Sequence, residues 1–442
     1  MRQTVHLASE PAAALGRAAR GFGIDGMAVA LAAPGRRALW TFGESRAGSG
    51  HLVDARTWFS VASLGKHVTA AAVLDLASGG ALDLRAPIGR YLPDVPTAWS
   101  DRSVLALLHH TSGLPEYLAY RPDEAVPSAR SDFMATYGSL AAAFGEGEGW
   151  IYTNTNYILA GMLVAQLRGA PYAEAVESLF DRVGCDGGAK VAGPDWARRV
   201  NEEPAMAGVP DPGSARREVI GDGDICFTPA GALAWLEGLL DGRLLDAEQT
   251  SEMFAPAQQR TGRPALYGCG WFLEPLRGAM LAHHGGHFDG WTAMGILHPG
   301  LGSGVVAMCN QAPGHTRHIR YLAQLALEAF CPGSTPLCLP VIEEDDPALA
   351  ARIRAQLLRA PGAAPEMSGL ADELRRVAEH GSAVRTVPNL NTGVEPDDFE
   401  LVERHAQPGG QWRRYRLHHA DRVEHVFVGV TPQGLLHWAW GL

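Results

Sequence analysis

The sequence contains very little lysine. Of the 37 basic residues only two, Lys66 and Lys190, are lysines, and the rest are arginines. An arginine stays protonated in a protein and cannot act as a base, whereas a lysine amine can accept a proton where its surroundings favour the neutral form. The position of each lysine is therefore informative about chemistry.

Long hydrophobic runs and a leader segment are also missing. No stretch reaches the roughly 18 apolar residues that suggest a membrane-spanning helix. Residues 1–10 contain no apolar segment followed by a cleavage site, so we expect a cytoplasmic protein. The formal net charge of −11 argues against nucleic acid and against an anionic membrane surface, because both require clustered cations. Small molecules or proteins are the expected partners.

Closely spaced cysteines are the third absence. The six cysteines are scattered, without Cys-x-x-Cys spacing, so we expect reduced thiols in the interior rather than disulfides or a metal site. No spacing indicates a cofactor either. The cysteines are Cys185, Cys226, Cys269, Cys309, Cys331 and Cys338.

One of the two lysines follows a serine at the start of an apolar segment. Residues 64–78 have the apolar spacing of a helix, which Gly79 and Gly80 end. Ser63 then lies at the first turn, where unpaired backbone N–H groups favour negative charge, with Lys66 on the same face. This arrangement suits a serine nucleophile with a lysine base. A capping serine followed by a surface lysine fits the same four residues.

A tyrosine and an asparagine precede a second apolar helix. The phenol of Tyr152, if placed beside Lys66, could accept the serine proton and return it to a leaving group. The amide of Asn154 could bind a substrate carbonyl and steady Lys66. A buried tyrosine and a capping asparagine are the alternative interpretation.

The third segment is rich in histidine and glycine and spans residues 283–291. Gly285 and Gly286 would let the backbone approach a substrate closely. A histidine beside Tyr152 would supply a hydrogen bond or a positive charge. Any one of these histidines could equally be a surface imidazole.

Together, the three segments resemble the serine β-lactamase and penicillin-binding-protein superfamily, in its class C, esterase and D-aminopeptidase branch, over about residues 10–331. The residues that match the motifs of that family are Ser63, Lys66, Tyr152, Asn154, His284, Gly285 and Gly286. The resemblance implies that Ser63 is the nucleophile and that the backbone N–H groups of Ser63 and His287 form an oxyanion hole. Residues 108–114 match a further signature, which we interpret as structural.

Two departures from the family pattern bear on the substrate. His284 stands where lactamases usually have lysine, which weakens the case for a true β-lactamase. The segment 222–228 replaces the family's Ala-Gly-Gly-Leu-x-Ser-Thr and contains Asp222 and Asp224. Either carboxylate, with Asp224 as our candidate, could hold a substrate ammonium. Solvated loop acids are the alternative.

The strand and helix patterns predict an α+β fold with two domains. Strands at both ends of residues 1–335 predict one antiparallel sheet flanked by helices, with a helical insertion, as in the β-lactamase and transpeptidase fold. Helices are expected at about 10–22, 64–78, 104–109 and 316–330, and strands at about 27–31, 38–43, 266–272, 280–283, 292–297 and 304–308.

Residues 336–442 are predicted to form a smaller α+β domain. A Pro- and Gly-rich stretch and an acidic stretch link it to the first domain. Helices are expected at about 348–359 and 369–380, and strands at about 399–405, 412–418, 423–431 and 435–440. The resemblance implies a lipocalin-like domain, although four strands do not make a full barrel.

The missing export signal directs the search to a substrate made inside the cell. The chain most resembles the penicillin-binding-protein-type thioesterases, which carry a lipocalin-like C-terminal domain. That resemblance implies that Ser63 accepts a nonribosomal peptidyl thioester, commonly with a D-residue at the acyl end, from a peptidyl carrier domain. Attack by the peptide's own amine would release a head-to-tail macrolactam.

Two other functions fit the same sequence. A D-stereospecific aminopeptidase, amidase or esterase would use the same residues and release the acyl group to water. A non-catalytic ligand-binding protein on this fold is the third hypothesis. Retention of Ser63, Lys66 and Tyr152 argues against it.

Overall fold

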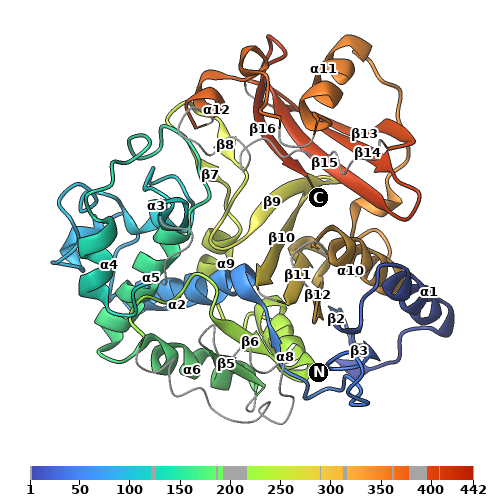
Figure 1. The fold of residues 1–442 in the computed structure, drawn as a ribbon, viewed down its shortest axis with the longest axis horizontal. Coiled ribbons are helices and arrows are strands. Elements are labelled where there is room, and N and C mark those ends of the chain that lie inside the picture. Colours follow the sequence, from blue (N-terminus) through green and yellow to red (C-terminus); the bar gives the residue numbers. More distant parts are fainter. Residues whose placement is uncertain are drawn as a thin grey trace.

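The large sheet is built from the two ends of the first 330 residues. The computed structural model describes residues 2–120, 126–185, 188–192, 217–288, 290–311, 316–360, 363–377, 396–407 and 409–441. Seven strands follow the order β1-β3-β2-β12-β11-β10-β9, antiparallel except for the parallel pair β1–β3 (Figure 1). Their bounds are β1 Gln3–Thr4, β2 Gly26–Ala33, β3 Arg36–Gly43, β9 Phe272–Leu276, β10 Ala279–Phe288, β11 Trp291–His298 and β12 Ser303–Cys309. The predicted sheet is confirmed.

Helices cover both faces of this sheet, which explains why every residue of β2, β11 and β12 is buried. Helices α1 (Ser9–Gly21) and α10 (Thr316–Phe330) cover one face with an apolar cluster of their own. The opposite face packs on α8 (Pro229–Leu240) and on the helical part of the chain.

The helical part surrounds α2 (Lys66–Ser78), which is buried along almost its whole length. The other helices are α3 Val104–Leu108, α4 Arg130–Tyr137, α5 Asn154–Arg168, α6 Tyr172–Val183 and α9 Ala247–Met253, with 3₁₀ helices η1 Ala62–Gly65, η2 Ile88–Arg90, η3 Tyr117–Ala119, η6 Pro299–Leu301, η8 Pro336–Cys338 and η9 Met367–Gly369. Two small sheets lie in the same part of the chain. One contains β4 Phe59–Ser60, β6 Ile225–Phe227 and β5 Ala189–Val191, and the other contains β7 Ala257–Gln258 and β8 Pro264–Ala265.

Within the described ranges, no helix combines the length and apolar character needed to cross a membrane.

A second sheet follows α10, as predicted. Its strands are β13 Asp398–Gln407, β14 Gly410–His418, β15 Val423–Val430 and β16 Leu436–Gly441, antiparallel in that order. Helices α11 (Pro347–Leu357) and α12 (Asp372–Val377) pack on one face. The sheet is open, because β13 and β16 do not pair with each other in the described part of the chain, so it lacks the closed barrel of a lipocalin. The predicted helix at 369–380 begins later, and residues 378–380 lie outside the described residues.

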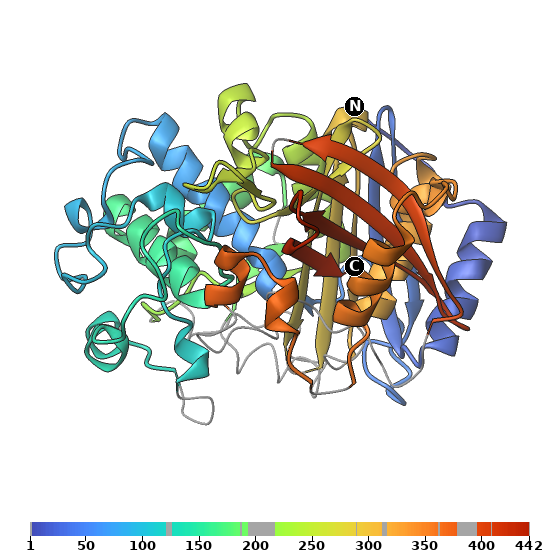
Figure 2. The same cartoon turned by 90° about the horizontal axis from the view of Figure 1, so that it is seen from above.

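The other face of the C-terminal sheet lies against the large sheet. Trp412, Phe427 and Trp438 share an apolar cluster with Trp150 and Phe272. Figure 2 shows the C-terminal strands, in red, lying across the yellow strands of the large sheet. The division of the chain at residue 335 stays a prediction, but the two sheets share a packed interface.

Two predictions are wrong in detail. The strand expected at 266–272 begins only at Phe272, because Gly270 has φ of +83°, and its Cα faces α2 so closely that a Cβ there would lie 2.6 Å from the Cα of His67. None of the six cysteines, all in described residues, forms a disulfide, but Cys338 is exposed and Cys331 is only half-buried.

Six of the buried histidines among the described residues have pKa values far below the ordinary value. Burial lowers the pKa of His67 and of His109 to about 4. The pKa values of the others are lowered as well, first by burial and then by nearby cationic groups. The six are His67, His109, His110, His283, His284 and His425. Each is neutral in the folded state near pH 7.

We predict that the protein loses stability in mild acid. A histidine whose pKa falls from 6.5 to about 4 on folding stabilises the native state fully above pH 6.5, and this contribution is lost as the pH falls through about 4. Urea unfolding across this window should show a steady fall in the free energy of unfolding. His109→Phe should reduce by one the number of protons that the chain takes up on unfolding. The free energy of unfolding should then fall less steeply with pH. A flat wild-type curve would contradict this account.

Candidate active site

A short, strained turn presents Ser63. The backbone N–H of Val61 donates to the carbonyl of Ile225 at 3.0 Å, which ties the end of β4 to β6. Ala62 then adopts φ of +44°, a left-handed conformation that is unusual for a residue with a Cβ and is held by the surrounding packing. Ser63 is half-buried in η1, the 3₁₀ turn that leads into α2, rather than in the first α-helical turn as predicted.

Lys66 is fully buried next to Ser63. Its Nζ donates to Asn154 Oδ1 at 2.8 Å and to the backbone carbonyl of Asp222, and it lies 3.2 Å from Ser63 Oγ, within reach of the hydroxyl proton. A buried amine needs such partners, because it has lost its water. The start of α2, the start of α5 and the loop before β6 therefore meet at one nitrogen atom.

Asn154 is oriented by a residue that the sequence motifs did not reveal. Its backbone N–H and its Nδ2 both donate to Glu116 Oε2, at 2.9 and 3.2 Å, and Glu116 is buried. This fixes the amide oxygen toward Lys66, as predicted. The other N–H of Nδ2 has no acceptor among the described residues and could bind a substrate carbonyl. Glu116 carries no motif of its own, so only the contact with the start of α5 identifies it.

Tyr152, which lies just before α5, is also close to Lys66. Its ring centre is 5.0 Å from Lys66 Nζ and 5.9 Å from the ring centre of His284. The ring stacks on that of Phe272, and its centre lies 4.6 Å from the ring centre of His110. His110, like Glu116, was not predicted to lie at this site. The structure thus brings together the three segments that the sequence analysis singled out.

His284 is a neutral imidazole. Burial, followed by the nearby amine of Lys66, lowers its pKa to about 3, so the predicted hydrogen-bonding role remains and the positive charge does not. Its Nδ1 lies 2.6 Å from the carbonyl oxygen of Gly285, which can only accept, so Nδ1 carries the hydrogen. The Nε2 atom is then an acceptor, and it has no hydrogen-bond partner among the described residues.

Strand β10 leaves its partner β9 where it reaches the site. The two strands pair only from Ala279 to His283, so residues 284–288 pair with β11 alone among the described strands. Gly286 packs directly on the serine turn, because a Cβ there would lie 2.0 Å from the carbonyl oxygen of Val61. His287, the predicted second oxyanion donor, follows at once and is exposed.

The two acidic residues before β6 already have partners. Asp222 accepts from the Tyr117 hydroxyl at 3.2 Å. Asp224 accepts from the N–H of Gly221 at 3.2 Å and pairs with Arg217 at 3.5 Å. Burial, followed by the charge of Asp222, raises the pKa of Asp224 to about 7. A substrate ammonium at Asp224 would have to compete with Arg217, and this role stays a prediction.

The comparison with known proteins agrees with this geometry. The sequence profile of the β-lactamase family matches residues 15–329. The chain belongs to the β-lactamase family. Its relatives include enzymes of the serine hydrolase and acyltransferase superfamily, which supports an enzymatic role for this chain. The predicted fold class is confirmed, and the C-terminal sheet lies outside the matched residues.

Relatives of known name share about a quarter of its residues. Penicillin-binding protein 4* of Bacillus subtilis (strain 168) is 26% identical over 60% of the chain, which spans only 64% of that relative. The D-alanyl-D-alanine-carboxypeptidase/endopeptidase AmpH of Escherichia coli (strain K12) is 26% identical over 58% of the chain and 72% of its own length. The D-amino acid amidase of Ochrobactrum anthropi SV3, solved with L-phenylalanine amide, shares the fold, with a TM-score of 0.58 and 24% identity over 73% of this chain and 97% of its own.

We predict that Gly286→Ala disables the site while Gly285→Ala does not. A methyl group at Gly286 must push β10 away from the turn that holds Ser63, and a displacement of about 1 Å costs roughly 100-fold in rate. At Gly285 the nearest atom is the flexible end of Met294, 3.1 Å away, which can move. The rate of Ser63 acylation by a penicillin or a fluorophosphonate measures the effect of each substitution. Equal acylation rates for the two variants would contradict the close packing of Gly286 on the turn that holds Ser63.

We also predict a pH-dependent KM if Asp224 binds an ammonium. Only the ionised carboxylate attracts a cation, so KM for amine-bearing substrates should fall as the pH rises through about 7. Asp224→Asn should raise KM and abolish this dependence, while substrates with a blocked amine serve as the control. An unchanged KM in the variant would remove Asp224 from the substrate site.

Proposed function

We propose that the chain is a serine acyltransferase that forms an acyl-enzyme on Ser63 from a peptidyl thioester and releases the peptide as a head-to-tail macrolactam. The observation that carries the proposal is the contact of Ser63 Oγ with the buried Nζ of Lys66 at 3.2 Å, flanked by Tyr152 and His284. No cofactor or metal takes part in this chemistry.

In the first step Ser63 Oγ attacks the thioester carbonyl. The serine proton passes to Lys66 and Tyr152, and the N–H groups of Ser63 and His287 stabilise the negative oxygen. The carbon–sulfur bond breaks, and the departing thiolate takes the proton. The product is an ester of Ser63, with Asn154 placed to bind the acyl carbonyl through its remaining N–H.

In the second step the amino end of the same peptide attacks the ester. This amine must be neutral to attack, and it must give up a further proton as the amide bond forms. We assign Tyr152 as the proton relay, because its ring centre lies 5.0 Å from Lys66 Nζ and 5.9 Å from the ring centre of His284. The phenol oxygen takes the amine proton as the phenol hydrogen passes to Lys66. Lys66, which has received this proton from Tyr152, gives it to Ser63 Oγ as the ester bond breaks, so that the hydroxyl, the amine and the phenol return to their starting states.

The names of the relatives support a D-residue at the acyl end. AmpH is a D-alanyl-D-alanine-carboxypeptidase/endopeptidase, and the solved amidase acts on D-amino acids. The donor we propose is a peptidyl carrier domain of a nonribosomal peptide synthetase, in the cytoplasm. The aromatic contact of Trp150 with Trp438, ring centres 4.8 Å apart, supports a role for the C-terminal sheet in shielding the ester from water.

A second candidate is a D-stereospecific aminopeptidase, amidase or esterase. The fold shared with the D-amino acid amidase favours it, since water would replace the peptide amine in the second step. A non-catalytic ligand-binding protein is disfavoured, because it has no need of an amine buried against a serine hydroxyl.

Product analysis by mass spectrometry tests the proposal. Short peptidyl thioesters ending in a D- or an L-residue, each with a free or an acetylated amino end, should give different products. We expect a cyclic peptide from the D-ended donor with a free amine, and an accumulated Ser63 ester from its acetylated counterpart. Ser63→Ala should form neither, and Tyr152→Phe should act about 100- to 10,000-fold more slowly.

Other outcomes separate the candidates. Linear acid released at equal rates from free and acetylated donors would contradict cyclisation and favour the hydrolase. An absence of any ester on Ser63, with every donor, would contradict both.

A further inference from the structure

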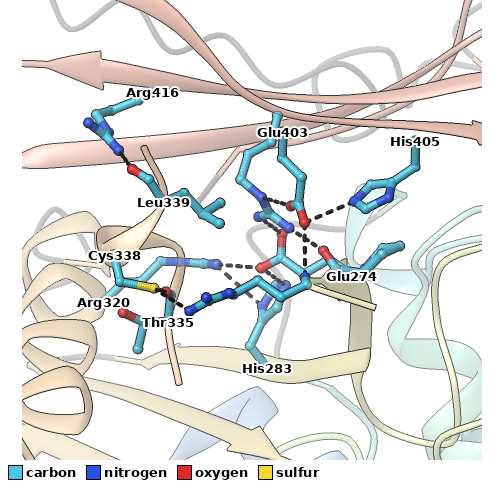
Figure 3. Close-up of polar contacts among 12 residues, drawn as sticks. Glu274, His283, Arg320, Thr335, Cys338, Leu339, Glu403, His405 and Arg416 are labelled. Atoms are coloured by element: carbon cyan, nitrogen blue, oxygen red, sulfur yellow. Dashed lines mark hydrogen bonds and ion pairs between the residues drawn. The ribbon is translucent and has the colours of Figure 1, made fainter. Parts of the chain in front are cut away.

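A fully buried arginine from the C-terminal sheet reaches into the large sheet. Arg414 of β14 donates to Glu274 Oε2 of β9 at 2.5 Å, to the carbonyl of Pro275, and to Glu403 Oε2 of β13 at 2.9 Å. Figure 3 labels the two glutamates, together with His283 and Arg320. Its side chain is 0% exposed, and its guanidinium lies 4.7 Å from the ring centre of Phe427. A planar group with five donors is suited to bridging two carboxylates in this way.

Glu274 extends the network to the strand that carries the candidate site. Its Oε1 lies 3.4 Å from Arg320 Nη2 of α10 and 3.6 Å from His283 Nε2 of β10. Arg320 Nη1 also lies 3.3 Å from His283 Nδ1. All these side chains are at most 5% exposed. One carboxylate therefore links the C-terminal sheet, α10 and β10.

His283 and the active-site residue His284 are neighbours on β10. Successive side chains of a strand point to opposite faces, so His283 faces the network while His284 faces Tyr152. Phe272 connects the two, because its ring stacks on His283 at 5.6 Å and lies 5.2 Å from the ring of His284. A change that moves His283 must also move His284 and Gly286.

Arg414 supplies one of the two arginine charges that face the buried carboxylates of Glu274 and Glu403. Arg320 supplies the other. His283 is neutral, because burial, followed by Arg320, His284 and Arg414, lowers its pKa well below the ordinary range. Without Arg414, two buried carboxylates would face one arginine, and an uncompensated buried charge is strongly destabilising.

We infer that Arg414 is a positioning residue for the candidate active site, because it holds β9 and β10 where His284 and Gly286 meet the Ser63 turn. The inference rests on the proposed function for the role of these residues. The C-terminal sheet is on this account part of the acyl-transfer site rather than an independent module.

A neighbouring arginine provides a matched control. Arg413 lies on the same strand, is 1% exposed, and also pairs with two carboxylates, those of Glu344 and Asp345, each at 2.5 Å. It faces the opposite side of the C-terminal sheet, toward α11, where Tyr415 Oη also contacts it. Arg413→Gln and Arg414→Gln thus each remove a buried guanidinium from one face of the same strand, although the carboxylates that pair with Arg413 are more exposed (23% and 50%) than those that pair with Arg414 (3% and 9%).

The experiment compares the two variants with the full-length wild type. Both substitutions should lower the melting temperature. Only Arg414→Gln should slow Ser63 acylation by a fluorophosphonate, on the order of 10- to 100-fold. Arg414→Lys should recover part of the rate, because it keeps the charge but cannot bridge both carboxylates. Equal acylation rates for Arg413→Gln and Arg414→Gln would overturn the inference.

A second readout does not depend on activity. Histidine-selective NMR should show altered ring signals of His284 in Arg414→Gln and unaltered signals in Arg413→Gln. The groups that face His283 are Glu274, Arg320, Arg414 and His284, with His425 of β15 beside the two arginines, so loss of Arg414 should also make His283 easier to protonate. Unaltered His284 signals would overturn the inference. A wild type that is never labelled at Ser63, together with the expected NMR change, would instead contradict the proposed function.

Discussion

A single buried nitrogen atom holds this site together. Lys66 Nζ contacts an oxygen of Ser63, of Asn154 and of the backbone at Asp222, which come from three distant parts of the chain. Because the amine is sealed from water, these contacts must form for the fold to tolerate it. The same requirement brings a proton acceptor to the serine. Stability and chemistry are therefore coupled at one residue, and the scarcity of lysine elsewhere makes that residue conspicuous.

Much of the fold could be predicted from local patterns. The short apolar runs in 27–43 and 292–308, separated by turn residues, predicted four strands of the large sheet, and the helix at 316–330 has the predicted bounds. The strand predicted at 266–272 was wrong, because the aromatic residues of this segment favour a strand while Gly270 packs on α2. Contacts between distant segments decide such cases. The prediction of only four strands also indicated that the C-terminal sheet would not close into a full barrel.

The candidate site was predictable only where its residues form motifs. Ser63, Lys66, Tyr152 and His284 were predicted and lie together. Glu116, which orients Asn154, and Arg414, which supports β10, have no motif, and each acts through a contact with a segment far away in the chain. The neutrality of His284 also depends on its burial. Sequence spacing carries no information on such contacts.

The most direct test of the account is whether Lys66 serves as the base for Ser63. The intact mass of the wild type and of Lys66→Arg would be followed during exposure to a fluorophosphonate, with peptide mapping of the labelled site. Arginine keeps the charge but cannot take the serine proton. The account predicts one label on Ser63 in the wild type and labelling at least about 100-fold slower in the variant. Labelling of Lys66→Arg at the wild-type rate, or of a residue other than Ser63, would contradict it.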